Sequence, residues 1–202
     1  MRSPSEEDRW QVMSSRAPIR LPPSRAELAI ARFCARRAFP SEERTLRILT
    51  VLADEKTVVA GALLCWACTR RNTKPRTKRE ADHMICSVMA GSALPHLLKH
   101  LFARERPNRT VGRSRSRRGI PLSGEAWDSF PSGHAINIGA IAAPLTRLVP
   151  ARVQPAVWPA LALLAASRVL LLAHYPSDVA AGLGLGVLVE RISVKLLGCS
   201  DT

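Results

Sequence analysis

Polar segments, two of them strongly basic, separate five mostly apolar stretches in this chain of 202 residues. A helix needs about 20 mostly apolar residues to cross a membrane, and charged loops normally separate such helices. None of the five is an ideal span. The first, for example, is short, and the second carries charged side chains. The pattern predicts an all-α fold, a membrane-embedded helical bundle with about five transmembrane helices. The stretches are residues 57–68, 81–102, 135–149, 156–173 and 179–197.

The balance of charge narrows the choice of partner. Lys and Arg number 30 against 16 Asp and Glu, a formal net charge of +14. Such an excess predicts an anionic partner, either nucleic acid or a membrane surface. The basic residues cluster outside the apolar stretches, as in 70–79 and 104–118, and the chain has no nucleic-acid-binding motif. We therefore expect an integral, multi-pass protein of a bacterial-type cytoplasmic membrane, in contact with an anionic membrane surface.

The N-terminal part of the chain differs from the rest. It begins with a polar, proline-rich segment that predicts a flexible tail and lacks the apolar core of a signal peptide. A helix is predicted over 24–39, where Ser24 and Glu27 form a capping box. Its apolar side chains interleave with arginines, so the helix either lies in the membrane plane or packs on the domain as a surface helix. We divide the chain into a basic N-terminal segment, 1–42, and a membrane domain, 43–198.

Two patterns that resemble ligand motifs are better explained by packing. Cys65 and Cys68 have the C-x-x-C spacing of metal and redox sites, but no second pair and no nearby histidine completes a tetrahedral site. We interpret them as packed thiols. Gly182, Gly184 and Gly186 lie in a uniformly apolar segment with no preceding strand, so they predict close helix packing and not dinucleotide binding.

Three polar clusters stand out against the apolar background. One closes the second apolar stretch, one opens the third, and one spans the turn between the fourth and the fifth. If the helices alternate in direction across a bilayer, these three points lie on the same face, and we expect the clusters to meet there. The clusters are Lys99 to Pro107 with Arg106, Pro131-Ser132-Gly133-His134, and Ser167-Arg168 followed by His174 and Asp178.

Together the clusters can surround a tetrahedral phosphate. Lys99, Arg106 and Arg168 supply positive charge, and arginine can bind phosphate in a bidentate manner. Ser132 and the backbone amide of Gly133 begin a helix, where free N–H groups and the helix dipole attract anions. Because charge inside a membrane is costly and is normally kept for function, the sequence predicts a phosphate-binding site at this face.

Two histidines are candidates for the chemistry. Asp178 follows His174 by four residues, and a carboxylate on one ring nitrogen would fix the tautomer and leave the other nitrogen free to attack phosphorus. His134 would then serve as general acid toward the leaving alcohol and as general base toward water. No cluster of carboxylates predicts a bound Mg²⁺, so the basic side chains would stabilise the transition state in its place. A single histidine near a helix end is more often structural, and we interpret the others, His83, His96 and His100, as structural or surface residues.

The three clusters resemble the motifs of the type-2 phosphatidic acid phosphatase superfamily. These motifs are Lys-x6-Arg-Pro, Pro-Ser-Gly-His and Ser-Arg-x5-His-x3-Asp, and each is intact here within residues 99–178. The resemblance implies a helical bundle, a phosphohistidine intermediate on His174, His134 as the acid and base, and no metal requirement, and we expect no other cofactor. It also implies that phosphate is bound by Lys99, Arg106, Ser132, Gly133 and Arg168.

The chain also departs from the layout of that superfamily. Its membrane members often have an additional span before the motifs, and here an Arg-rich amphipathic segment at 43–56 takes that place. We therefore expect about five spans and one interfacial helix. The family's membrane enzymes usually face their site away from the cytoplasm, but the basic residues are divided between both sides, so the orientation stays open.

Three functions are compatible with these sequence features. The first is a lipid phosphatase acting on a phosphate monoester or diphosphate, with phosphatidate, phosphatidylglycerophosphate and polyprenyl phosphates, some bearing a sugar, as substrate classes. The second is a vanadium-dependent haloperoxidase. The resemblance implies that such enzymes have the same pocket, but they are soluble and larger. The third is a non-enzymatic basic protein that binds membranes. The motifs define a phosphate pocket and leave both the lipid and the oligomeric state open.

Overall fold

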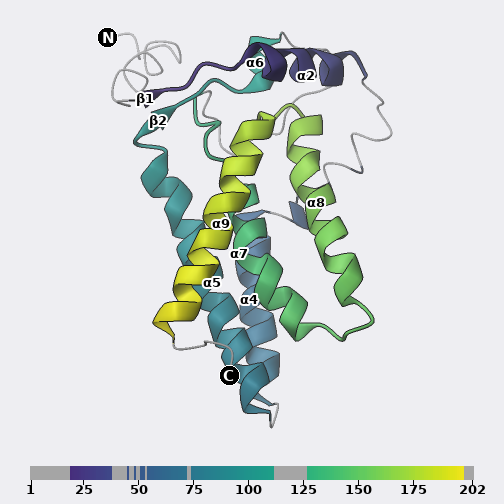
Figure 1. The fold of residues 1–202 in the computed structure, drawn as a ribbon, viewed down its shortest axis with the longest axis vertical. Coiled ribbons are helices and arrows are strands. Elements are labelled where there is room, and N and C mark those ends of the chain that lie inside the picture. Colours follow the sequence, from purple (N-terminus) through teal and green to yellow (C-terminus); the bar gives the residue numbers. More distant parts are fainter. Residues whose placement is uncertain are drawn as a thin grey trace, which may run out of the picture.

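The computed structural model describes residues 19–37, 45, 48, 51–52, 54–71, 74–111 and 127–197. Most of the residues in these ranges are helical, as the apolar stretches predict. Five long helices run along the longest axis of the molecule and form a bundle (Figure 1). They are α4 (Glu55–Arg70), α5 (Pro75–Leu98), α7 (Gly133–Leu148), α8 (Gln154–Leu170) and α9 (Pro176–Leu196).

The long helices differ in extent from the predicted stretches. α5 begins earlier than residue 81, because Pro75 suits the first turn of a helix, and it therefore includes the basic residues that follow. No helix in the described ranges combines the length and the apolar character of a membrane-spanning segment. Most of the predicted flexible tail and half of the amphipathic segment at 43–56 lie outside the described residues.

Successive long helices run in opposite directions. α5 rises to the upper end of the molecule, α7 descends, α8 rises again, and α9 descends to the C-terminus (Figure 1). The end of α5, the start of α7 and the turn between α8 and α9 therefore share one end of the bundle. This is the arrangement that the three polar clusters require in order to meet.

The first helix of the chain, α2 (Arg25–Arg36), begins with the predicted capping box. The Glu27 amide donates to the Ser24 hydroxyl over 3.2 Å, and the Ser24 amide donates to the Glu27 carboxylate over 2.7 Å. Two of the four unpaired amides of the first turn are satisfied in this way. The predicted start of this helix is confirmed.

α2 lies across the upper end of the bundle (Figure 1). Its buried side chains, Ala31 and Cys34, pack against Leu172 and Tyr175 in the turn between α8 and α9. Of the two predicted placements, packing on the domain is confirmed. The outward side of α2 still exposes apolar surface, and contact with a membrane stays a prediction for the exposed side chains Ile30 and Phe33.

A short parallel strand pair is an element that the all-α prediction missed. β1 (Ile19–Arg20) pairs with β2 (Phe102–Ala103), with Ile19 opposite Phe102. Two residues are too few to produce the alternation of apolar and polar side chains by which a strand is recognised. The pair ties the N-terminal segment to the chain that leads from α5 into the short helix α6 (Pro107–Thr110).

At the lower end of the bundle, a polar cluster joins α5, α7 and α9. Arg147 forms ion pairs with Glu80 over 2.7 Å and with Glu190 over 2.9 Å. His83 is buried beside them, with Nδ1 3.1 Å from Arg147 Nη2 and Nε2 3.2 Å from the Glu190 carbonyl oxygen. Pairing of this kind offsets the cost of burying the charges and fixes the relative positions of the three helices.

α7 and α9 approach each other through glycine. A methyl group placed on Gly186 would lie 2.1 Å from the carbonyl oxygen of Ile136, and one on Gly139 would lie 2.4 Å from the carbonyl oxygen of Leu183. A methyl group on Gly182 would likewise lie 2.6 Å from the Ser132 carbonyl oxygen, whereas Gly184 has no neighbouring atom within 4 Å. Close packing through small residues is therefore confirmed for two of the three predicted glycines.

This geometry predicts that Gly186→Ala and Gly184→Ala have opposite effects on stability. The added methyl group at 186 collides with the backbone of α7 and should lower the free energy of unfolding by about 1–3 kcal/mol or more. At 184 it meets open space and should raise helix stability by up to about 1 kcal/mol. Thermal unfolding of the two variants in the same detergent checks this. Equal melting temperatures for both variants would show that the helices do not cross at these glycines.

Candidate active site

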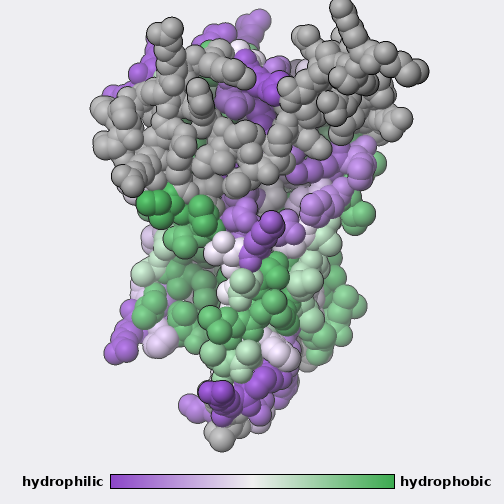
Figure 2. All heavy atoms as spheres, turned by 180° about the vertical axis from the view of Figure 1, so that it is seen from behind, coloured by the Kyte–Doolittle hydropathy of each residue, from purple (hydrophilic) through white to green (hydrophobic). Residues whose placement is uncertain are grey.

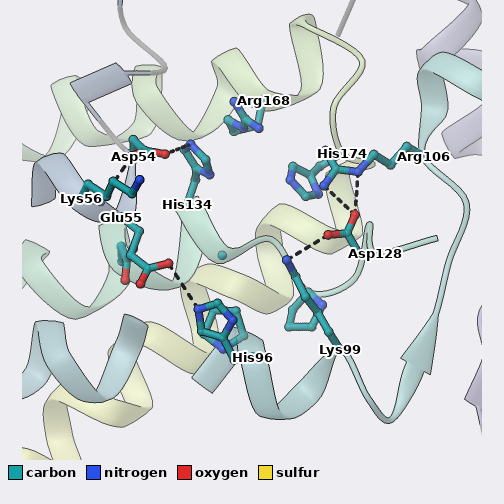
Figure 3. A pocket seen from close by; sticks show the side chains of 14 residues that line it. Asp54, Glu55, Lys56, His96, Lys99, Arg106, Asp128, His134, Arg168 and His174 are labelled. Atoms are coloured by element: carbon teal, nitrogen blue, oxygen red, sulfur yellow. Dashed lines mark hydrogen bonds and ion pairs between the residues drawn. The ribbon is translucent and has the colours of Figure 1, made fainter. Parts of the chain in front are cut away.

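The three predicted clusters meet at one pocket. Its cavity volume is about 380 Å³, and it opens where α5 ends, α7 begins and α8 turns into α9. Figure 3 shows the side chains around it. Of the predicted site residues, the pocket is lined by Lys99, Arg106, Gly133, His134, Arg168 and His174, whereas Ser132 and Asp178 are fully buried outside its lining.

Two of the predicted phosphate-binding cations share one carboxylate. Asp128 accepts from Arg106 Nε over 2.9 Å and from Arg106 Nη2 over 2.6 Å, and its other oxygen lies 2.9 Å from Lys99 Nζ. Burial alone would raise the pKa of Asp128, but the charges of Arg106 and Lys99 and their hydrogen bonds outweigh it and hold this pKa below its ordinary value. Asp128 therefore stays ionised and fixes both cations in place.

Asp128 was not predicted from the sequence. It lies in the segment before the Pro-Ser-Gly-His motif, and its only signal is that it is an acidic residue close to this motif. Its pairing with Lys99 and Arg106 depends on the folded chain, since nothing in their spacing links the three residues.

Arg168 approaches the pocket from the end of α8. The residue is buried, and its Nε has no hydrogen-bond partner among the described residues. A buried and unpaired guanidinium donor costs free energy, so its presence in a pocket needs an explanation. An anion bound in the cavity would supply the missing acceptor, in agreement with the predicted phosphate contact.

His174 is buried in the turn that follows α8. Its Nδ1 lies 2.7 Å from the backbone carbonyl oxygen of Ser129 and 3.9 Å from Asp178 Oδ2. The carbonyl can only accept, so Nδ1 carries the proton, and Nε2 of the neutral ring is left free. The sequence predicted that Asp178 would fix this tautomer, but the nearer partner is the carbonyl of Ser129.

The pKa of His174 lies well below its ordinary value. Burial contributes most, followed by the positive charges of Arg106 and Arg168, and the hydrogen bond to the Ser129 carbonyl opposes them only partly. The imidazole is therefore neutral at neutral pH, which is the state in which a histidine can act as a nucleophile.

The turn that carries His174 has an unusual backbone. Leu172 has a φ of 55°, which lies in the left-handed region that a branched, non-glycine residue rarely adopts. Its side chain is buried against α2, and the amide of Asn108 donates to its carbonyl over 3.1 Å. These contacts hold the strained conformation and with it the position of His174.

Asp178 is held at the start of α9 by several donors. Its Oδ2 accepts from the Ser129 hydroxyl over 2.6 Å and from the Tyr175 amide over 2.8 Å. Its Oδ1 accepts from Arg104 Nη1. The link from Asp178 to His174 therefore runs through Ser129, whose hydroxyl binds the carboxylate and whose carbonyl binds the ring.

The Pro-Ser-Gly-His motif begins α7 as predicted. The Ser132 hydroxyl accepts from the Ala135 amide over 3.5 Å and caps the helix, and the Ser132 amide donates to the Asp178 carbonyl over 3.2 Å. Gly133 lines the pocket, so of these two residues it is the one placed to meet a ligand. His134 lies on the wall opposite His174, with Arg168 between them in Figure 3. Its Nε2 has no hydrogen-bond partner among the described residues.

The wall beyond His134 comes from residues that were not predicted to lie at the site, including His96, which was interpreted as structural or surface. The start of α4 brings Asp54, Glu55 and Lys56 to the pocket, where Asp54 lies 3.9 Å from His134 Nε2. His96 lies 3.5 Å from Glu55, so this histidine is part of the pocket wall. The only sequence signal for the first three is that they form a charged run directly before the apolar stretch 57–68.

Comparison with known proteins agrees with this geometry. Residues 83–198 match the family model of the PAP2 superfamily. The chain is 37% identical over 109 residues to the lipid A 1-phosphatase of Rhizobium etli, a match that covers 52% of this chain and 44% of the relative. It is 33% identical over 118 residues to the decaprenylphosphoryl-5-phosphoribose phosphatase of Mycobacterium tuberculosis, covering 58% of this chain and 62% of the relative. The chain thus spans less than two thirds of the length of either relative.

Two solved structures share the fold. The crystal structure of LpxE from Aquifex aeolicus has a TM-score of 0.66 at 21% identity and covers 83% of this chain and 94% of that one. A transmembrane PAP2-type phosphatidylglycerolphosphate phosphatase from Bacillus subtilis has a TM-score of 0.62 at 19% identity, covering 87% and 86%. Because the family model matches more than half of the 202 residues and includes all three motifs, the chain belongs to the PAP2 superfamily.

Proposed function

We propose that this protein is a lipid phosphatase that hydrolyses a phosphate monoester or diphosphate of a membrane lipid through a phosphohistidine on His174. The observation that carries the proposal is a buried His174, bonded through Nδ1 to the Ser129 carbonyl, in a pocket whose other walls present Lys99, Arg106 and Arg168. The relatives are named as phosphatases, and they favour neither the haloperoxidase nor the non-enzymatic alternative. Residues 43–198 are proposed as the phosphatase domain.

The proposed reaction has two steps. In the first, Nε2 of His174 attacks phosphorus, the bond to the lipid oxygen breaks, and His134 gives that oxygen a proton. In the second, His134 takes a proton from water, the water oxygen attacks phosphorus, and the bond to His174 breaks to release phosphate. Lys99, Arg106 and Arg168 stabilise the charge on the phosphoryl oxygens in both steps, which is the role that a metal would otherwise have.

A membrane location is supported by the outer surface of the bundle. Large apolar side chains stand out from the long helices, as in Leu64 at 66%, Leu97 at 67% and Leu196 at 80% exposure. Figure 2 shows apolar residues gathered over the middle of the molecule and hydrophilic ones at its lower end. Such a surface is unfavourable in water and suits contact with lipid. We propose that the long helices lie in the bilayer, with the pocket at one face.

The substrate classes to test first come from the relatives and from the pocket wall. The relatives are named for lipid A 1-phosphate and for a decaprenyl-linked phosphoribose, and a structural neighbour for phosphatidylglycerophosphate. Beyond the phosphate-binding end, Asp54 and Glu55 offer acceptors for headgroup hydroxyls, and Lys56 offers one cation. We therefore propose a phosphorylated, hydroxyl-bearing headgroup, such as a sugar, as the preferred substrate.

Phosphate release by detergent-purified protein in EDTA, from a panel of these lipid phosphates, tests the function. We expect release by the native chain, inhibition by vanadate, and a loss on the order of 10³-fold or more in His174→Ala, because the nucleophile is removed. His100→Ala is the matched control, since His100 is exposed and lies outside the pocket lining, and it should retain native activity. Equal release from the native chain and His174→Ala would contradict the proposal.

The low pKa of His174 predicts how activity depends on pH. Protonation of Nε2 removes the lone pair that would attack phosphorus. Because the pKa of His174 in the folded protein lies well below 6.5, this protonation requires a more acidic solution. An ordinary histidine would be about three quarters protonated at pH 6, whereas here kcat/KM at pH 6 should stay close to its value at pH 7.5. The measurement is the pH profile of kcat/KM, corrected for the second ionisation of the substrate phosphate at about pH 6. An acid limb at or above 6.5 after this correction would refute the prediction.

A further inference from the structure

A second charged cluster adjoins the site without lining its pocket. Arg104 is buried and donates through Nη2 to Glu27 over 2.7 Å. Its Nη1 donates to Ser177 Oγ over 2.7 Å and also to Asp178. The Ser177 hydroxyl donates in turn to Glu27 Oε1, which closes a ring of contacts. None of Glu27, Arg104 and Ser177 is among the residues that line the cavity.

The cluster connects three separate parts of the chain. Glu27 lies in the first turn of α2, Arg104 follows β2, and Ser177 and Asp178 begin α9. The pKa of Glu27 is lowered to about 2, because hydrogen bonds from Ser177, the Ser24 backbone and Arg104 outweigh the opposing effect of burial. Glu27 is therefore ionised at neutral pH, and its negative charge balances the positive charge of Arg104.

Arg104 is also held by further contacts, although its Nε has no hydrogen-bond acceptor among the described residues. Its guanidinium lies 4.6 Å from the centre of the Tyr175 ring, a cation–π contact. Its backbone amide donates to the Trp127 carbonyl over 2.9 Å, and its carbonyl accepts from the Ser129 amide over 3.1 Å. The backbone of Arg104 therefore holds the segment that contains Ser129, while its side chain holds Asp178.

These contacts lead to the nucleophile. The Ser129 hydroxyl donates to Asp178, and the Ser129 carbonyl accepts from His174 Nδ1 over 2.7 Å. Arg104 thus supports both partners of the pair that sets the tautomer of His174, and Glu27 supports Arg104. If Ser129 or Asp178 moved, the hydrogen bond from His174 Nδ1 could lengthen and the other tautomer of the ring could form.

We propose that Glu27 and Arg104 are positioning residues of the phosphatase reaction, which hold Asp178 and Ser129 so that His174 keeps its proton on Nδ1 and presents Nε2 to phosphorus. The inference depends on the proposed function for its catalytic consequence. Its geometric part concerns His174 alone and can be observed without turnover.

The charges of the cluster predict opposite effects on the pKa of His174 for the loss of Glu27 and the loss of Arg104. Glu27, Arg104 and Asp178 together carry one net negative charge, which becomes zero without the carboxylate of Glu27 and minus two without the guanidinium of Arg104. The other groups that act on His174 are Arg106, Arg168, His134 and the Ser129 carbonyl, and they are unchanged. Loss of Glu27 should therefore lower the pKa of His174, and loss of Arg104 should raise it.

The experiment uses Glu27→Gln and Arg104→Gln in the full chain. Nitrogen-15 NMR of labelled histidine in detergent, with His174 assigned through His174→Ala, reports both tautomer and pKa. We expect the native ring to be protonated at Nδ1, a mixture of tautomers in both variants, and the opposite pKa shifts given above. In the phosphate-release assay, both variants should lower kcat about 10- to 100-fold with KM changed less than about 3-fold, because orientation and not substrate binding is lost.

Ser24→Ala is the matched control. It removes the capping hydroxyl at the start of the same helix and leaves the contact between Glu27 and Arg104 in place. A role of Glu27 that is limited to holding α2 would make this control behave like Glu27→Gln, and that result would overturn the inference. The inference predicts instead a native tautomer and native kcat for Ser24→Ala. If Arg104→Gln fails to fold, Glu27→Gln and its control are sufficient.

The outcomes separate this inference from the proposed function. An unchanged His174 tautomer and pKa in Glu27→Gln, together with native kcat, would overturn the inference and leave the phosphatase intact. Native protein without His174-dependent release from any lipid phosphate would overturn the proposed function and the catalytic half of the inference. In that case the NMR measurement would still decide the geometric half.

Discussion

The close contact of α7 with α9 is the constraint on which the site depends. Gly139, Gly182 and Gly186 contribute no side chain to the crossing, so the two backbones approach each other closely. The first turn of each helix is thereby brought into hydrogen-bonding contact, where the Ser132 amide donates to the Asp178 carbonyl over 3.2 Å. His134 on one helix and the turn before the other can then face the same cavity. A larger residue in the crossing would separate the two histidines as well as the helices.

Charge is distributed in this molecule so that each buried ion has a partner or a reason to lack one. Asp128 pairs with two cations at the pocket, and Arg147 is paired at the opposite end of the bundle. Arg168 lines the pocket, and its Nε has no acceptor among the described residues. Such an ion is costly to bury, and the cost is offset when an anion arrives. If the protein has the proposed function, this unpaired charge favours a phosphate in the pocket over a neutral headgroup.

The sequence could predict the helices and the meeting of the three motifs, because both follow from local patterns and from alternation in direction. It could not predict Asp128, Ser129 or Arg104, whose roles depend on contacts between distant segments. The glycines show the same limit. A repeat at every second residue does not fit one helix face, so Gly184 points into open space while Gly139, outside the repeat, lies in the crossing.

The pairing of His174 with Asp178 shows why spacing alone misleads. Residues four apart meet on a helix, but His174 lies in the turn before the N-cap, Tyr175, so the helical rule does not apply to it. Asp178 instead accepts from the Tyr175 amide, as a residue in the first turn of a helix often does. Its remaining capacity is divided between Arg104 and Ser129. The orientation of His174, the proposed nucleophile, is therefore set by the backbone carbonyl of Ser129, and it depends on the position of the segment that carries this carbonyl.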